Sequence, residues 1–178
     1  MTFQKQLIVL VALTLCAALA LVAASTEMSR LARQVRHELV MLPYYGVFDN
    51  FEFRLDGSKV TLMGQVVRPT LKSSAERVVK NVEGVSEVVN EIEVLPVSHQ
   101  DDDIREMTYR AIYGHPALDR YSYRAVPPIH IIVKNGKITL EGIVNNKSDK
   151  QIAYMQARSV PGAFSVTDNL RLDENSES

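Results

Sequence analysis

The residue types best suited to chemistry gather in residues 105–124, where arginines alternate with tyrosines. An arginine guanidinium matches the geometry of a phosphate, and a tyrosine combines an apolar ring with a wet hydroxyl, which suits the headgroup zone of a membrane. The set could therefore hold an anionic phospholipid surface. The alternative is a solvated helix face whose tyrosines cover the core, with Glu106 and Asp119 diluting the charge. The candidate residues are Arg105, Tyr109, Arg110, Tyr113, Arg120, Tyr121, Tyr123 and Arg124.

The sequence shows no catalytic or metal-binding pattern. Its four histidines stand outside any recognised catalytic spacing. Three consecutive carboxylates, at residues 101–103, are better explained as favourable charge at a helix start than as a metal cluster. Cys16 is the only cysteine and lies in an N-terminal apolar run, which excludes thiol and zinc–thiolate chemistry from the folded part. We therefore expect no enzyme activity, no metal and no cofactor.

The formal net charge of −1 gives no global attraction to nucleic acid. Any attraction to phosphate must be local. The sequence predicts no nucleic-acid partner.

The N-terminal segment predicts export. An almost unbroken apolar run over residues 7–24 ends in small residues that resemble a cleavage site, so residues 1–25 are predicted to be a signal peptide. A retained signal anchor stays open, because the run of about 18 residues just reaches the span of a bilayer. Arg30, Arg33 and Arg36 follow the run and disfavour an uncleaved helix in the export orientation. They could line a basic stripe beside lipid headgroups or form a plain surface. The expected location is periplasmic or envelope-associated.

An internal repeat organises the rest of the chain. Residues 59–66 (KVTLMGQV) recur as residues 137–144 (KITLEGIV), a shift of 78 residues. The same shift carries Ala75 to Ala153 and Val82 to Val160 without gaps. The chain is therefore predicted to contain two copies of one domain.

Each copy has the pattern of the same series of elements. A first helix has its apolar positions three and four apart, for example at Leu31, Val35 and Leu39. A connector of about a dozen residues, a hairpin with alternating apolar residues, an amphipathic second helix and a last strand over residues 90–95 follow. The predicted fold is α+β: two tandem α-β-β-α-β domains, each a three-stranded sheet with two helices on one face, after the N-terminal hydrophobic segment.

The domain boundaries follow from this pattern. The first domain is predicted over residues 27–96, a linker over 97–102, the second domain over 103–173 and a disordered tail over 174–178. Asp103 is the expected N-cap of the helix that opens the second domain.

Six glycines have structural rather than chemical explanations. Those after the hairpin turns supply positive φ angles, those after the second helices end them, and those inside the strands are expected to let a helix approach the sheet closely. In chain order they are Gly57, Gly64, Gly84, Gly136, Gly142 and Gly162.

The second copy carries extra apolar groups on its second helix and in the loop that follows. Four polar or charged residues of copy one become Ile152, Tyr154, Met155 and Phe164. These could face outward, toward lipid, a partner or copy one. A slightly rotated helix that buries them is the alternative, because Leu71 becomes Asp149 at the same time.

These motifs resemble the BON domain family. Copy one contains the turn glycine Gly57, the VTLMGQV strand at residues 60–66, an Ala-Glu pair at residues 75–76 and the GVSEVVN motif at residues 84–90. Copy two keeps the strand motif and departs over residues 161–169. The resemblance covers about residues 27–173. It implies an exported bacterial envelope protein, linked to membrane integrity or osmotic stress and thought to bind phospholipid, with no catalytic residues to carry over.

Two functions stay open on this basis. The first is a non-enzymatic envelope protein that binds anionic phospholipid headgroups mainly through its second domain. The alternative is a periplasmic interaction adaptor that docks an envelope protein, or a second copy of itself, through the apolar groups of domain 2.

Overall fold

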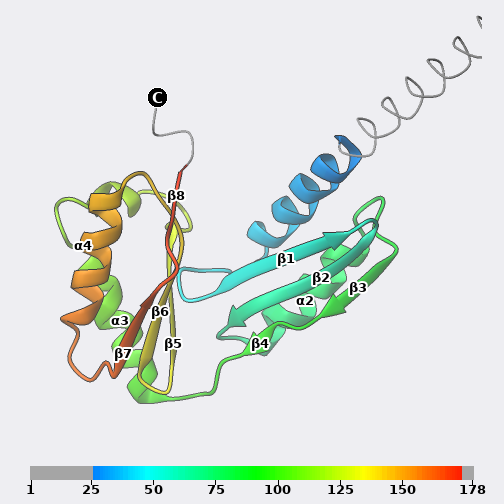
Figure 1. Ribbon diagram of the computed structural model, residues 1–178. Helices are drawn as coiled ribbons and strands as arrows, with labels where there is room; N and C mark the ends of the chain where they lie inside the picture. The colour runs from blue at the N-terminus through cyan, green and yellow to red at the C-terminus, as the bar shows by residue number, and fades with distance from the viewer. Residues whose placement is uncertain (1–25, 174–178) are drawn as a thin grey trace, which may run out of the picture.

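The computed structural model describes residues 26–173 (Figure 1). The predicted signal peptide and the predicted disordered tail lie outside these residues. Within them, no helix combines the length and apolar character needed to cross a bilayer.

Domain 1 has the predicted order of elements. It is helical over residues 26–40 and continues with β1 (Asn50–Asp56), β2 (Lys59–Val66), α2 (Pro69–Lys80), β3 (Glu87–Asn90) and β4 (Glu93–Val94). Strand β2 is central, with β1 antiparallel on one side and β3 and β4 parallel on the other. The expected last strand is thus present in two short pieces that pair with the same neighbour. Ile92 lies between the pieces and is fully buried.

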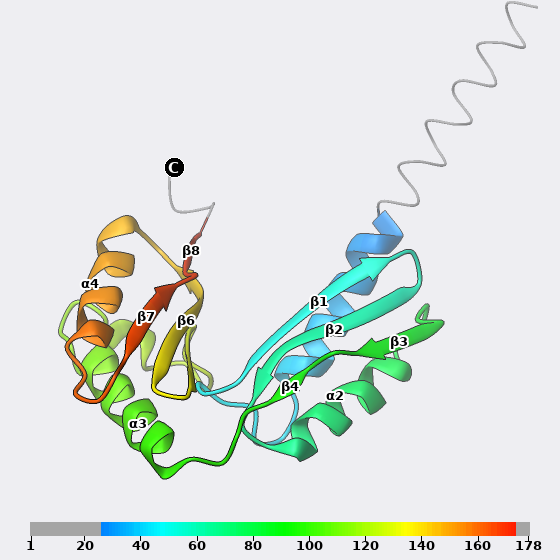
Figure 2. The same cartoon turned by 60° about the horizontal axis from the view of Figure 1, so that its bottom comes forward.

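Domain 2 repeats this arrangement. Its elements are α3 (His99–Tyr113), the short helix η1 (Asp119–Tyr121), β5 (Ile129–Lys134), β6 (Lys137–Val144), α4 (Lys147–Arg158), β7 (Ser165–Asp168) and β8 (Arg171–Leu172). The register also repeats, because Leu62 pairs with Phe53 in the first hairpin and Leu140 with Ile131 in the second. The predicted fold is confirmed in both copies. Helices α3 and α4 cover the face of the second sheet that is turned away from domain 1 (Figure 2).

Each domain has its own hydrophobic core. Residues of the helix at 26–40, β2 and α2 form the first cluster, including Val35, Leu62 and Val79, which are all 0% exposed. A second cluster around Ile131 and Leu140 fills domain 2. Among the described residues, 26–173, both clusters are built from residues between 31 and 172, and a fragment that starts at residue 26 keeps all of these side chains.

The predicted N-cap of the second domain is wrong. Helix α3 begins at His99, and the N-cap is Ser98, whose side chain accepts a hydrogen bond from the Asp101 amide at 3.2 Å. Residues 99–102 are therefore helical rather than part of a linker. The reason is tertiary: Asp101 is 1% exposed and accepts bonds from the amides of Asn135 and Gly136, which docks the start of the helix on the hairpin turn.

The expected role of the strand glycines is also wrong, although all six glycines named above have positive φ. A Cβ on Gly64 would lie 2.1 Å from the carbonyl oxygen of Asn50, and one on Gly142 would lie 1.9 Å from that of Pro128. The close neighbour is thus the backbone of the adjacent strand, not a helix. With φ of +105° and +119°, both residues mark a local distortion that only glycine accommodates.

Candidate functional site

Two members of the predicted arginine and tyrosine set cap the free edge of β5 and are buried. The Tyr113 hydroxyl donates to the Ile129 carbonyl at 2.6 Å and accepts from the Ile129 amide at 3.0 Å. The Arg105 guanidinium donates to the Val133 carbonyl at 2.7 Å and pairs with Asp102. Their exposures of 6% and 3% leave them no surface to offer a membrane. Burial also raises the pKa of Tyr113.

A second pair from the set stabilises the long connector of domain 2. The Tyr121 hydroxyl donates to Asp149 at 2.5 Å, and Arg120 forms a salt bridge with the same carboxylate. Asp149 is 3% exposed and stands where copy one has the core residue Leu71. The connector residues Arg120 and Tyr121 thus supply partners for the buried Asp149 side chain, so α4 keeps this position inward without a rotation relative to α2. Burial raises the pKa of Tyr121, and the Asp149 carboxylate raises that of Arg120.

The remaining members of the set are accessible to different degrees. Arg110 is exposed but pairs with Glu106 one helical turn away. Tyr109 is half-buried against Phe48, at 6.3 Å between ring centroids. Tyr123 is 83% exposed and Arg124 beside it is also exposed. The structure therefore separates the predicted set, and Tyr123 and Arg124 are the neighbouring pair in which both side chains are exposed.

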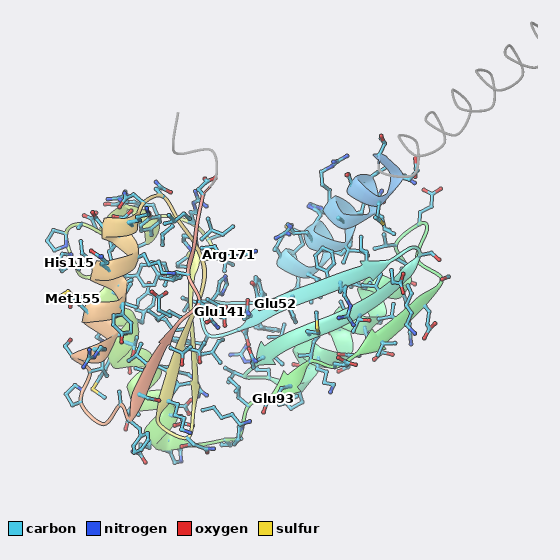
Figure 3. All side chains as sticks on the ribbon, viewed as in Figure 1. Glu52, Glu93, His115, Glu141, Met155 and Arg171 are labelled. Carbon is cyan, nitrogen blue, oxygen red and sulfur yellow. The ribbon has the colours of Figure 1, made fainter. Side chains whose placement is uncertain are left out.

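The four apolar residues of copy two also separate. Ile152 is half-buried and packs on the core of domain 2, and Tyr154 is half-buried under the guanidinium of Arg158. Met155 and Phe164 are 67% and 81% exposed. Figure 3 shows Met155 on the side of α4 that faces away from domain 1. Two of the four residues therefore face outward, and the other two are half-buried without a rotation of α4.

The two domains touch through the connector of domain 1. The Val47 carbonyl accepts a hydrogen bond from the Ile131 amide at 2.8 Å, and Phe48 packs against the core of domain 2. The rings of Tyr45 and His130 stack at 5.6 Å. Burial raises the pKa of Tyr45 to about 12 and lowers the pKa of His130, which keeps this contact uncharged at neutral pH.

A salt bridge between Lys134 and Glu93 adds a second contact between the domains. Glu93 lies in β4, on the part of domain 1 that faces domain 2 (Figure 3).

A cleft of about 470 Å³ lies between the domains, beside β1. Its walls carry three arginines, Arg36 from the first helix, Arg124 from the connector of domain 2 and Arg171 from β8, together with Asp173. None of the salt bridges formed within residues 26–173 involves these three arginines. Glu141 lies near Arg171 in this region (Figure 3), and burial raises its pKa. The cleft walls are therefore predominantly basic.

Comparison with known proteins identifies the family. The model of the BON domain matches residues 29–96 and again residues 100–174. The chain belongs to the BON domain family. BON domains form a non-catalytic family that is associated with envelope proteins and with phospholipid binding.

Two solved structures are similar to this pair of BON domains. Both are of CdsD, a structural protein of the type III secretion system of Chlamydia trachomatis, one of them its C-terminal domain. They are 13% identical, with coverage of 79% and 82% of this chain and 96% and 94% of theirs, and have TM-scores of 0.28 and 0.29. A likeness at that level carries no weight for function. No curated protein gives a significant match.

Sequence reasoning missed how the two BON domains share a surface. From the sequence, Arg30, Arg33 and Arg36 could line a basic stripe or form a plain surface. In the structure Arg30 and Arg33 line a groove beside α2, whereas Arg36 lines the cleft. Arg171 and Tyr45 carried no sequence signal of their own. Only the outward position of Arg171 on an alternating strand could have drawn attention to it, because the cleft exists only once the connector docks on domain 2.

Proposed function

We propose that this protein is exported and acts without catalysis in the periplasm or at the envelope surface, where it binds anionic phospholipid headgroups and supports membrane integrity or osmotic stress tolerance. One observation supports this most directly. In each domain the connector after the first helix exposes a tyrosine beside an arginine. Tyr44 is 76% exposed with the Arg68 guanidinium 5.0 Å from its ring centroid, and Tyr123 is 83% exposed next to Arg124.

The chemistry of these pairs suits a membrane surface. The tyrosine ring can enter the interface while its hydroxyl stays wet, and the guanidinium can pair with a phosphate. Each cation near an anionic surface contributes about 1 kcal/mol, so one pair binds weakly. Two pairs bind more tightly than one when both reach the same surface. This extends the predicted contact set, because Tyr123 and Arg124 belong to it and Tyr44 and Arg68 do not.

Vesicle flotation of residues 26–178 tests the proposal. The fragment should float with vesicles of phosphatidylcholine mixed with phosphatidylglycerol, less so in high salt, and not with phosphatidylcholine alone. Replacing Tyr123→Ala with Arg124→Gln, or Tyr44→Ala with Arg68→Gln, should weaken binding by at least about five-fold. The exposed Arg77→Gln on α2 removes the same charge elsewhere and is the matched control. Flotation that is absent, or that neither double variant reduces, contradicts the proposal.

The export part of the proposal has its own measurement. Intact-mass analysis of the full-length protein recovered from the envelope should give a mature N-terminus near residue 25. A mass that retains residues 1–25 would instead support a signal anchor.

A second candidate function is an interaction adaptor that associates through domain 2. The exposed side chains of Met155 and Phe164 favour it, because large apolar groups on a surface are costly without a partner. The substitutions Met155→Arg and Phe164→Ser restore the residues of copy one, Arg77 and Ser86. Sedimentation equilibrium should then show self-association in the parent protein and a monomer in the double variant. A parent that is monomeric at all concentrations removes this self-associating form.

A further inference from the structure

The two hairpins differ in how their outer edges are completed. In β5, three alternate residues direct backbone groups away from the sheet, and each of them has a hydrogen-bond partner. Ile129 bonds to the Tyr113 hydroxyl. Ile131 bonds to the Val47 carbonyl, and Val133 bonds to the Arg105 guanidinium. Open edges of this kind invite another strand, and proteins usually cover them. Domain 2 covers its edge with two long side chains and the connector of domain 1.

The equivalent edge in domain 1 is β1. The strand register identifies the matching residues. Phe51 pairs with Gly64 in the first hairpin, as Ile129 pairs with Gly142 in the second. By the same register Phe53 corresponds to Ile131 and Leu55 to Val133. Asp56 and Lys59 flank the two-residue turn and form a hydrogen-bonded pair. Bonded pairs alternate along the hairpin, so the backbone N–H and C=O groups of Phe51, Phe53 and Leu55 point to the outer edge of β1.

The residues that would cap β1 cannot do so. The first helices correspond through Leu31 and Ile104, because a Cβ added to Gly84 would lie 3.8 Å from the Leu31 side chain and one added to Gly162 would lie 3.9 Å from the Ile104 side chain. Arg105 and Tyr113 therefore match Ala32 and Val40, neither of which has a side-chain donor. Among residues 26–173, no turn, loop or side-chain hydrogen bond reaches the outward backbone groups of the three β1 residues.

The uncapped edge opens into the basic cleft rather than into bulk solvent. Phe51, Phe53 and Val40 line the cleft from domain 1, and Ile143 lines it from domain 2. Val40 and Ile143 are 45% and 43% exposed, which gives the walls an apolar component. Three arginines, Arg36, Arg124 and Arg171, line the walls together with one carboxylate, Asp173. Glu141 lies near Arg171 but does not line the cleft.

We propose that the cleft binds an extended acidic peptide segment of a partner protein, which adds to the outer edge of β1 as a further strand. Backbone hydrogen bonds to Phe51, Phe53 and Leu55 would hold the segment, a length of about 13 Å at the rise of a β-strand. The arginines would select carboxylate side chains, and Val40 and Ile143 would contact the apolar residues that alternate with them. This partner site shares Arg124 with the proposed lipid-binding pairs. The backbone groups of β1 have no part in lipid binding, and the Tyr44–Arg68 pair does not line the cleft, so peptide binding can fail while lipid binding stands.

Amide hydrogen exchange on residues 26–178 tests the proposal with a defined probe, a capped octapeptide of alternating glutamate and valine. In the free protein the Phe53 amide should exchange faster than the capped Ile131 amide. The peptide should slow the Phe51 and Phe53 amides at least about tenfold. A lysine–valine peptide should bind at least about tenfold more weakly, and the acidic peptide N-methylated at its valines should not bind.

A cap transplanted from domain 2 provides the matching variant. Ala32→Arg with Val40→Tyr introduces the side chains of Arg105 and Tyr113, and should abolish peptide binding while the protein stays folded. Val97→Tyr, at a position that is 96% exposed in the linker, is the control and should bind normally. Circular dichroism and thermal melting confirm the fold of each variant.

Several results would overturn the proposal. They are equal exchange of the Phe53 and Ile131 amides in the free protein, no slowing by the acidic peptide at millimolar concentration, or undiminished binding to a folded capped variant. Protection of the β1 amides by anionic vesicles instead of peptide would assign the cleft to lipid and also reject a protein partner.

Discussion

Removing the Tyr113 hydroxyl tests whether side chains complete the edge of β5. Tyr113→Phe keeps the ring, which is almost fully buried, and deletes the one atom that bonds both the N–H and the C=O of Ile129. Two buried backbone groups would then lack a partner. Each such group costs about 1–3 kcal/mol, so the variant should lose about 2–4 kcal/mol of unfolding free energy after the small gain from a more apolar ring.

The assay is urea denaturation of residues 26–178, followed by far-UV circular dichroism and by the exchange rates of amides in each domain. The loss should fall on domain 2, and the Ile129 amide should exchange fastest relative to the parent protein. Tyr123→Phe removes the same atom from a side chain that is 83% exposed and should change stability by less than about 0.5 kcal/mol.

A Tyr113→Phe loss as small as that of Tyr123→Phe would refute this reasoning. Solvent would then be completing the β5 edge in place of the hydroxyl. The contrast between a closed β5 edge and an open β1 edge would lose its basis, and with it the proposed peptide site.

Three further predictions concern the cores, a strand glycine and the domain contact. Leu62→Ala and Leu140→Ala, both at fully buried positions, should each cost about 2–5 kcal/mol and accelerate amide exchange mainly in their own domain, whereas a shared interior would destabilise both. Gly142→Ala should cost at least about 2 kcal/mol in thermal or urea unfolding, because its Cβ would lie 1.9 Å from the Pro128 carbonyl oxygen. Burial lowers the pKa of His130 below its ordinary 6.5, so the unfolded chain binds this proton more tightly and the stability present above that pH should fall as the solution becomes more acidic. His130→Gln should reduce that pH dependence in calorimetry, and an unchanged slope would show that other groups cause it.

The repeat made the fold predictable because strand register is a local property. Apolar alternation places Leu62 and Leu140 inward, and turn residues fix the hairpin that pairs them with Phe53 and Ile131. Core positions on the helices follow from spacing in the same way. These signals repeat in both copies, so each copy supports the interpretation of the other.

The functional surface was less predictable because it depends on contacts between distant segments. Arginine and tyrosine look alike in sequence whether they meet lipid or cap a strand, and only the fold shows that Arg105 and Tyr113 reach the β5 edge. The capping difference between the copies is also hidden, since the strands correspond with a shift of 78 residues but the first helices with a shift of 73. The connector between the first helix and the hairpin is longer in copy two, which accounts for the difference between the two shifts. This longer connector also places Tyr121 in contact with Asp149.

The duplication has consequences that neither copy would have alone. A lone copy with an uncapped edge strand would tend to pair with other chains, which is why such edges are normally blocked. In this protein the connector of domain 1 docks on β5 through Val47, and the docking places domain 2 beside the open edge of β1. Domain 2 can therefore shield that edge from bulk association while its arginines restrict what enters. Copy one has Ala32 and Val40 where copy two has the capping residues Arg105 and Tyr113, so domain 2 takes over the covering of the β1 edge and leaves it available as the proposed strand-binding site.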